Sequence, residues 1–199
     1  AFKCEHTHVG MSSVLKSGKT VNLFSPTVMT EDFLSAIGYG TIMGILKNYE
    51  VVNPFISATN DSLNRLKPGF EAPVVTSLGH VPETPSRNRT ILAGLVRDVE
   101  NPYATRFEVR ACNPYTNTYI ALAAIYLAAF DGIKAAVTSG KSTTELLAEL
   151  SKEAGQEGFY LEKDRAYRSE EDVFEDYEDE ERDRLFGRPP ATVWENMIA

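Results

Sequence analysis

Charged side chains of both signs alternate along the stretch RFEVR, which begins at Arg106. Arg106, Glu108 and Arg110 take every second position, and Phe107 and Val109 lie between them. Alternate side chains of a strand share one face, so we expect the three charges on one face and the two apolar side chains on the other. Guanidinium groups suit phosphate or carboxylate ligands. The commoner interpretation is a half-buried strand whose salt-bridged charges face water.

Two histidines near the start form an HxH pattern, His6-Thr7-His8. On a strand this spacing places both imidazoles on one face, about 6 to 7 Å apart along the backbone. Histidine is a common metal ligand, but a protein zinc site needs a third and a fourth ligand, and none lies nearby in the sequence. Two hydrogen-bonded histidines at a sheet edge are therefore the commoner outcome for this pattern taken alone.

Two further segments carry charges in a context typical of loops. Residues 60–73 are aperiodic, and a loop of this length is as often functional as it is a solvated surface loop. Its charged residues are Asp61, Arg65, Lys67 and Glu71. Arg87-Asn88-Arg89 follows a proline-rich insert and can form a guanidinium fork for a phosphate or carboxylate. Gly140-Lys141-Ser142 is not a phosphate-binding loop, because the first glycine of that motif would fall at Ala135, inside a predicted helix.

Length and composition exclude several classes of protein. The chain has 199 residues, 43% of them hydrophobic, which is enough for one large domain or a fragment of a larger one. Two cysteines make no disulfide framework, which favours a reducing, cytoplasmic setting. The longest apolar run, residues 120–130, is shorter than the roughly 18 residues of a membrane span, so we expect no membrane association.

The charge is distributed unevenly. The net charge is -8, but residues 149–183 hold fifteen acids and five bases, a balance of -10, so the remainder carries +2. The arginines of that remainder gather at Arg87, Arg89, Arg97, Arg106 and Arg110. This clustering suits a small anionic ligand better than nucleic acid, which requires a broad excess of positive charge.

Hydrophobic periodicity predicts a chain that contains both strands and helices. We expect strands or extended chain at 3–13, 19–24 and 105–111, and loops at 53–73 and 80–89. We expect helices from a Thr30 cap to Tyr49, from 117 to 137, from a Ser142 capping box, and in a solvated acidic stretch at 169–185. The helix at 117–137 is apolar almost all round between residues 120 and 130, which predicts complete burial. A last capping box, at residues 192–195, has only four residues after it, and the chain starts without methionine, so we expect a truncated polypeptide.

Taken together, these motifs resemble the second half of the catalytic domain of the glutamine synthetase family. The resemblance covers roughly residues 1–137. It rests on the HxH pair, the loop pattern N-x4-RLxPGFEAP, RNR, RFEVR, and the segment from NxYxALAA to DGI. It implies an α+β fold, a mainly antiparallel sheet backed by long helices. It also implies two parts, a C-terminal piece of the catalytic domain at 1–141 and a helical acidic segment packed on it at 142–199.

The resemblance also implies an activity and a role for each site residue. The activity is ATP-dependent ligation of ammonia to glutamate through γ-glutamyl phosphate, with Mg²⁺ or Mn²⁺ as the metal. His6 and Glu108 would bind metal, His8 and Arg106 would lie by the nucleotide phosphates, and Arg65 and Arg110 would bind glutamate. Glu71 would shield the intermediate and accept a proton from ammonium, and Arg89 would neutralise the transferring phosphoryl group. Such roles suit these residue types, because phosphoryl transfer depends on positioning and charge neutralisation.

The chain also departs from the family pattern. Where the family has an arginine shortly after RNR, this chain has Gly94, and Arg97 is a shifted candidate for that arginine. Where the family has a lysine before the strand of Glu108, this chain has Tyr103. Two alternatives stay open: a ligase that joins glutamate to another amine, and a decayed member that binds glutamate or nucleotide for regulation. The resemblance implies that the complete protein is a homo-oligomer, which in the family is ring-shaped. This chain alone is expected to be inactive, because one glutamate and one histidine cannot hold Mg²⁺ tightly.

Overall fold

The α+β prediction is confirmed by the computed structural model, which describes residues 5–67, 72–81, 84–85, 88–169, 173 and 176–198. A five-stranded sheet has the order β1-β7-β6-β4-β5. Its strands are β1 (Thr7–Val9), β7 (Arg106–Val109), β6 (Ile91–Val96), β4 (Val75–Val81) and β5 (Thr84–Pro85). All its pairs are antiparallel except the parallel pair of β4 and β6. A separate hairpin joins β2 (Ser12–Val14) to β3 (Thr20–Asn22).

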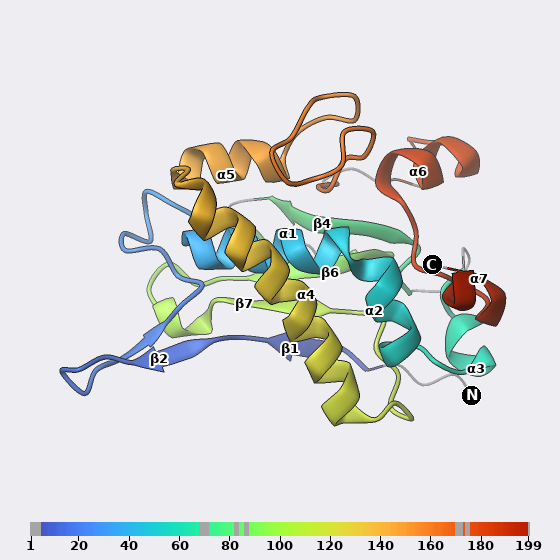
Figure 1. Cartoon of the computed structure of the whole chain (residues 1–199), viewed down its shortest axis with the longest axis horizontal. Coiled ribbons are helices and arrows are strands. Elements are labelled where there is room, and N and C mark those ends of the chain that lie inside the picture. The colour runs from blue at the N-terminus through green and yellow to red at the C-terminus, as the bar shows by residue number, and fades with distance from the viewer. Residues whose placement is uncertain are drawn as a thin grey trace.

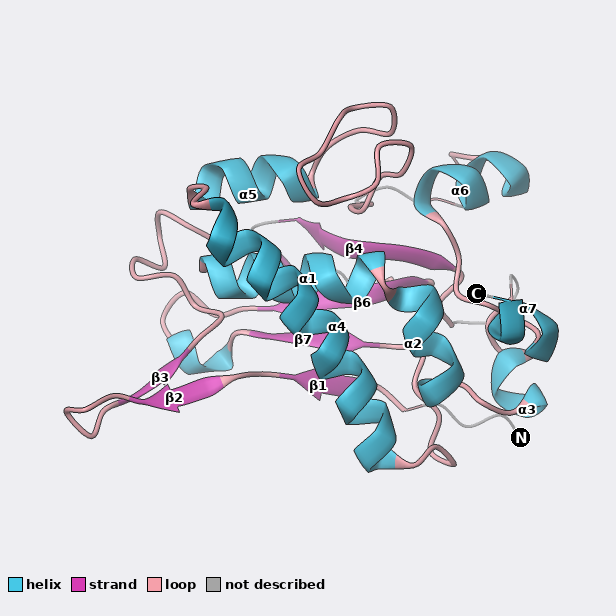
Figure 2. Cartoon of the chain, in the orientation of Figure 1, coloured by secondary structure: helices cyan, strands magenta, loops and turns pink. Residues whose placement is uncertain are grey.

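Helices cover one face of this sheet (Figures 1 and 2). The helices of the described residues are α1 (Ala36–Lys47), α2 (Tyr49–Ile56), α3 (Asn60–Leu63), α4 (Thr118–Ser139), α5 (Thr143–Leu150), α6 (Asp179–Phe186) and α7 (Val193–Ile198), with a short 3-10 helix at Pro102–Ala104. In the view of Figure 1, α4 crosses in front of α1, and both lie in front of β7 and β6. The helical side of the sheet is therefore two layers deep at its centre.

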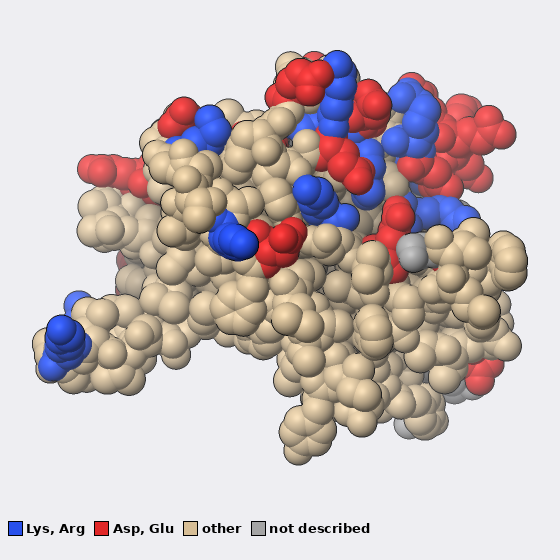
Figure 3. All heavy atoms as spheres, viewed as in Figure 1, with Lys and Arg blue, Asp and Glu red and all other residues tan. Residues whose placement is uncertain are grey.

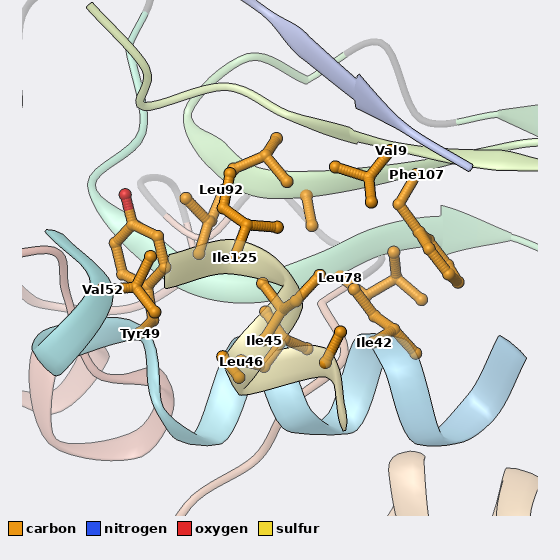
Figure 4. Close-up of a cluster of buried hydrophobic side chains, with 14 of the residues drawn as sticks. Val9, Ile42, Ile45, Leu46, Tyr49, Val52, Leu78, Leu92, Phe107 and Ile125 are labelled. Atoms are coloured by element: carbon orange, nitrogen blue, oxygen red, sulfur yellow. The ribbon is translucent and has the colours of Figure 1, made fainter. Parts of the chain in front are cut away.

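The hydrophobic core lies between the sheet and α1. Val9 and Phe107 are fully buried, and Figure 4 shows them projecting from neighbouring strands toward the helix that carries Ile42. Phe107 also stacks at a tilt on Phe24, with ring centroids 5.3 Å apart. Because strand side chains alternate, burying these residues forces their neighbours in sequence onto the opposite face of the sheet.

Glycines let α1 and α4 approach each other closely. A Cβ added at Gly44 would lie 2.2 Å from the carbonyl oxygen of Ala128, and one at Gly132 would lie 2.1 Å from the carbonyl oxygen of Gly40. No real Cβ tolerates such distances to backbone. The small residues at this crossing therefore allow α4 to pack against the core. They also position residues 110–117, which connect β7 to α4.

The prediction that α4 is buried all round is wrong. One stripe of small residues and Ile125 faces the core, but Leu127 is 70% exposed and Phe130 53%. The run of apolar residues combines a core face and an outer face, which periodicity cannot separate when both are apolar. By length and hydropathy α4 is the one described helix that meets the criteria for crossing a membrane, with a third of its apolar window buried. Its packing on α1 accounts for that buried third.

The first helix begins later than predicted, at Ser35 rather than Thr30. The Ser35 hydroxyl accepts a hydrogen bond from the N–H of Gly38 at 3.1 Å, which satisfies one free donor of the first turn. The region predicted as loop from residue 53 onward contains the end of α2 and all of α3. Pro54, which lacks an N–H to donate to the preceding turn, lies inside α2, and the helix ends at Ile56.

The acidic C-terminal stretch is helical over a shorter range than predicted. Helix α6 begins at Asp179, and the described residues 176–178 before it are not helical. Three acids occupy the first turn of α6, where the helix dipole favours negative charge.

Two oppositely charged residues at the end of α5 hold the segment that follows it. The carboxylate of Glu149, 8% exposed, accepts hydrogen bonds from the N–H groups of Phe159, Tyr160 and Leu161 at 2.8–3.1 Å. The ammonium group of Lys152, 6% exposed, donates to the carbonyls of Glu162, Lys163 and Arg165. This irregular segment is thus organised by two buried charges, each satisfied by backbone groups.

Replacing Glu149 by Ala should lower the free energy of unfolding by about 3 kcal/mol. The change leaves three N–H groups without their acceptor, and bonds to a charged group are the stronger kind. In a chain of this length that loss lowers Tm by roughly 6–12 °C. Thermal denaturation followed by circular dichroism measures it. Glu153→Ala, an exposed glutamate on the same segment, should change Tm little, and equal shifts for both variants would contradict this role of Glu149.

Candidate functional site

The charged face of β7 lies on the side of the sheet opposite α1. Phe107 and Val109 are fully buried while Arg106 and Glu108 are only partly so, which confirms the alternation predicted from RFEVR. Strand β1 pairs antiparallel with β7, and His8 lies directly opposite Glu108. The HxH pair and the RFEVR charges, about a hundred residues apart in sequence, therefore share one surface.

A three-residue cluster forms the centre of this surface. His6 donates from Nδ1 to Oε1 of Glu108 at 2.6 Å, and Arg110 donates from Nε and Nη2 to Oε2 of the same carboxylate at 3.2 and 3.1 Å. Partial burial acts to raise the pKa of Glu108, but the charge of Arg110 and the hydrogen bonds from Arg110 and His6 outweigh it and lower that pKa. Glu108 is thus held as a carboxylate with one oxygen shared with an imidazole.

His8 and Arg106 form a second pair on the same surface. The guanidinium of Arg106 donates from Nε to Nδ1 of His8 at 3.0 Å and from Nη1 to the carbonyl of Ala104 at 2.8 Å. Partial burial, and then the charge of Arg106, lower the pKa of His8. An imidazole that accepts at Nδ1 carries its proton on Nε2, so His8 presents an N–H donor away from Arg106.

The two candidate glutamate-binding arginines are buried. Arg110 is 2% exposed, and its Nη1 donates to the carbonyl of Asn88 at 2.5 Å. Arg65 is 4% exposed, and it donates to the carbonyls of Arg110 at 3.5 Å and Cys112 at 3.1 Å. For Arg65 the alternative of a solvated surface loop is wrong, since the side chain braces the backbone that follows β7.

The remaining candidates are placed only in part. Arg89 is exposed beside Asn88, whose carbonyl binds Arg110, so the Asn88-Arg89 end of RNR adjoins the cluster. Glu71 and Arg87 lie outside the described residues. The guanidinium of Arg97, the shifted candidate for the expected arginine, donates to the backbone carbonyls of residues 29, 32 and 33. The hydroxyl of Tyr103, where the family has lysine, donates to the carbonyl of Thr20 at 2.7 Å.

The departure at Gly94 has a structural consequence. Gly94 pairs with Glu108 across β6 and β7, and a Cβ at this position would lie 2.4 Å from Nη2 of Arg110. The Arg110 guanidinium therefore lies over Gly94, in the space that any side chain at 94 would take. Sequence reasoning identified the missing arginine but not this consequence, because contact between residues 94 and 110 depends on strand register.

Replacing Gly94 by Ala should displace Arg110 and weaken its fork on Glu108. We expect a loss of about 1–3 kcal/mol in the free energy of unfolding, the usual cost of overpacking at a buried site. Chemical denaturation measures this loss. Gly10→Ala is a matched control on the neighbouring edge of the sheet, since a Cβ there would meet Arg106 at an ordinary 3.9 Å. Unchanged stability of Gly94→Ala would contradict the proposed position of Arg110.

The described residues supply only part of a metal site. No group of three or more histidine, cysteine, aspartate or glutamate side chains gathers within the described ranges. His6 and Glu108 offer two donors of suitable type at one point, but Mg²⁺ takes about six, mostly oxygen. The pair fits one corner of a divalent-metal site whose other ligands are water, substrate or further protein groups.

Comparison with known proteins decides the family. The family model described as "Glutamine synthetase, catalytic domain" matches residues 3–162, which include every described residue of the site. The chain belongs to the glutamine synthetase catalytic-domain family. The match extends past the last recognised motif, DGI at 131–133, to the segment held by Glu149 and Lys152.

Relatives in this family include whole glutamine synthetases. The enzyme of Escherichia coli K12 is 33% identical over 155 residues, 76% of this chain and 29% of the relative. That of Methylococcus capsulatus is 36% identical over 151 residues, 74% of this chain and 29% of the relative. The solved glutamine synthetase of Plasmodium falciparum has a TM-score of 0.59 at 21% identity, over 96% of this chain and 37% of its own, which shows the fold alone. The chain spans less than a third of the length of the two curated relatives named above.

Proposed function

We propose that this chain is part of a ligase that joins ammonia to glutamate at the expense of ATP, through γ-glutamyl phosphate. The observation that carries the proposal is the His6–Glu108–Arg110 cluster, a carboxylate between a metal-ligating residue type and a buried guanidinium on one face of the sheet. Membership of the glutamine synthetase family supports it. Within the same proposal the complete protein is a cytoplasmic homo-oligomer that acts on small molecules, with no nucleic acid or membrane as partner.

In this proposal the charged surface divides between metal, nucleotide and glutamate. His6 and Glu108 would hold Mg²⁺ or Mn²⁺, which when bound neutralises phosphate charge. The hydrogen bond from Arg106 to Nδ1 of His8 leaves the Nε2–H of His8 directed away from Arg106. The imidazole of His8 and the guanidinium of Arg106 could then both donate to phosphate oxygens of ATP. Arg110, and Arg65 beneath it, would orient the carboxylates of glutamate. Arg89 and Glu71 would act on the transferring phosphoryl group and on the ammonium proton.

The buried position of Arg110 has a mechanistic consequence. Its guanidinium is held by the carbonyl of Asn88 and by Glu108, so it offers a fixed charge instead of a mobile one. Groups that are already positioned pay little reorganisation when charge develops on the substrate. Holding the glutamate carboxylate still relative to the phosphoryl donor is the main task in phosphoryl transfer.

One observation favours a second candidate, a ligase for a different amine or a regulatory binder. Gly94 and Tyr103 replace two basic residues that the family pattern expects, and Arg110 fills the space over Gly94. Fewer cationic groups near the nucleotide weaken phosphate neutralisation. A decayed member would keep glutamate or nucleotide binding and lose turnover.

An amine screen with the complete gene product tests the proposal. Purified protein is incubated with ATP, Mg²⁺, glutamate and one amine at a time, and the γ-glutamyl product is measured by mass spectrometry. Glutamine formed from ammonia supports the first proposal, and a product from another amine alone supports the second ligase. Absence of every product, with ATP binding retained, would overturn both ligase proposals and leave the regulatory binder.

A further inference from the structure

Asn22, the last residue of β3, connects the β2–β3 hairpin to the turn that leads into β7. Its Nδ2 donates to the carbonyl of Thr105 at 2.7 Å and to the carbonyl of Tyr103 at 3.3 Å. Its Oδ1 accepts from the N–H of Phe24 at 2.9 Å. Since both ends of the amide are hydrogen-bonded, Asn22 has one defined orientation. The two carbonyls that it holds lie on either side of Ala104 in the sequence.

The carbonyl of Ala104, between those two, holds Arg106. Ala104 is the last residue of the short 3-10 helix, so its carbonyl has no partner within that helix. Nη1 of Arg106 donates to this carbonyl at 2.8 Å, and Nε of the same guanidinium donates to Nδ1 of His8 at 3.0 Å. The guanidinium is rigid and planar, so these two bonds fix its plane. The bond at Nδ1 in turn sets the tautomer of His8.

Arg106 and His8 keep donors for a ligand. The guanidinium carries more N–H groups than the two that Ala104 and His8 accept, and His8 carries its proton on Nε2. Donors held in a fixed relation suit the oxygens of a phosphate group, and they bind it with little further loss of side-chain entropy. The quality of this pair as a phosphate site therefore depends on the position of one carbonyl, that of Ala104.

The hairpin holds this turn through neutral groups. Figure 2 shows the short 3-10 helix beside β2 and β3, and Figure 3 shows lysine at the tip of the hairpin. Within residues 11–24 the charged side chains are Lys16 and Lys19, both in that tip. Neutral hydrogen bonds depend closely on distance and angle. The effect of Asn22 on Arg106 is therefore one of position and not of charge.

We propose that Asn22 is a positioning residue for phosphate binding: by holding the carbonyls beside Ala104 it places Arg106, and through Arg106 it selects the tautomer of His8. This role rests on the proposed function, in which Arg106 and His8 lie by the phosphates of ATP. Asn22 acts through backbone, because its hydrogen bonds go to main-chain groups of residues 24, 103 and 105. It lies more than eighty positions from the turn in the sequence, so no local pattern indicates this role.

Asn22→Asp in the complete gene product tests this role. Aspartate keeps the size of the side chain and the acceptor for Phe24, but it loses both donors and sets a negative charge against two carbonyls. The KM for ATP should rise about tenfold, because a small displacement of binding groups is costly, while the KM for glutamate should stay within about twofold. Ser25→Ala is the matched control, since Ser25 donates to the carbonyl of Pro102 at the start of the same turn. It should change neither KM by more than about twofold.

The imidazole signals of the 199-residue chain separate a failure of this role from a failure of the proposed function. The chain has three histidines, so ¹H–¹⁵N spectra at about pH 8.5, where imidazole is ordinarily neutral, can resolve His8, with His8→Gln for assignment. The wild type and Ser25→Ala should show the Nε2–H tautomer of His8, and Asn22→Asp a mixture with the Nδ1–H tautomer.

Three results for Asn22→Asp would overturn its role: an unchanged tautomer of His8, an unchanged KM for ATP, or equal rises in the KM values for ATP and glutamate, which a loss of stability alone would give. A wild type that does not use ATP would overturn the proposed function and its nucleotide site, whatever the tautomers show.

Discussion

Replacing Gly132 by Ala should lower the free energy of unfolding by at least about 3 kcal/mol, at the upper end for overpacking, because the new methyl group meets backbone that cannot give way. The Cβ would lie 2.1 Å from the carbonyl oxygen of Gly40 and 2.5 Å from the amide nitrogen of Gly44. Helices α1 and α4 must separate to admit it, and that separation opens the core above the sheet. A typical domain has only about 5–15 kcal/mol of stability in total, so this loss removes a large share of it and lowers Tm by roughly 6–12 °C or more.

Two other glycine variants separate this clash from ordinary effects. Gly44→Ala, at the same crossing, should be equally damaging, since its Cβ would lie 2.2 Å from the carbonyl oxygen of Ala128. Gly140→Ala, where φ is +65° and no atom lies within 4 Å, should cost only about 1 kcal/mol, the cost of a left-handed residue with a side chain. Urea denaturation of the three variants gives the comparison. Equal losses for Gly132→Ala and Gly140→Ala would show that the helix crossing is not as close as described.

Replacing Glu108 by Gln should reduce the activity of the complete protein by on the order of 100-fold or more, as does loss of one preorganised charged contact in other active sites. Glutamine keeps the shape of the side chain and can still accept a hydrogen bond from Arg110. It loses the negative charge that a divalent metal needs, and it leaves the charge of buried Arg110 uncompensated.

The matched control for this prediction is Glu100→Gln, which neutralises an exposed glutamate in the turn before β7. It should leave the activity within about twofold, because surface charges far from a site contribute little. The measurement is the dependence of kcat/KM on Mn²⁺ concentration for the wild type and both variants. Activity of Glu108→Gln within twofold of the wild type would remove Glu108 from the proposed metal site.

The sequence predicted the alternating faces of β7 better than the packing around that strand. Alternation along RFEVR places its charges on one face because the period of a strand is two, and Phe107 is buried as that period requires. Strand pairing, however, sets which distant residues meet. His8 lies opposite Glu108 only because β1 pairs with β7, and no local pattern specifies that register.

Two differences from the predictions come from tertiary contacts. Helix α4 is apolar on both faces, so composition alone predicted burial all round, whereas its outer face is exposed in this chain. Arg65 is surrounded by loop-like sequence, yet it is buried because the carbonyls of Arg110 and Cys112 accept its guanidinium hydrogen bonds. When a buried charge is hydrogen-bonded by backbone groups far away in the sequence, the residues beside it in the sequence do not predict its burial.

Oxygen transfer from glutamate to phosphate is the most direct measurement of the proposed chemistry. If the complete protein activates glutamate as γ-glutamyl phosphate, one oxygen of the γ-carboxylate leaves with the phosphoryl group when ammonia attacks. Glutamate labelled with ¹⁸O in that carboxylate should therefore give phosphate with one ¹⁸O atom per glutamine formed, detected by mass spectrometry. Phosphate released without ¹⁸O, at a rate that does not depend on glutamate and ammonia, would contradict the proposed ligase.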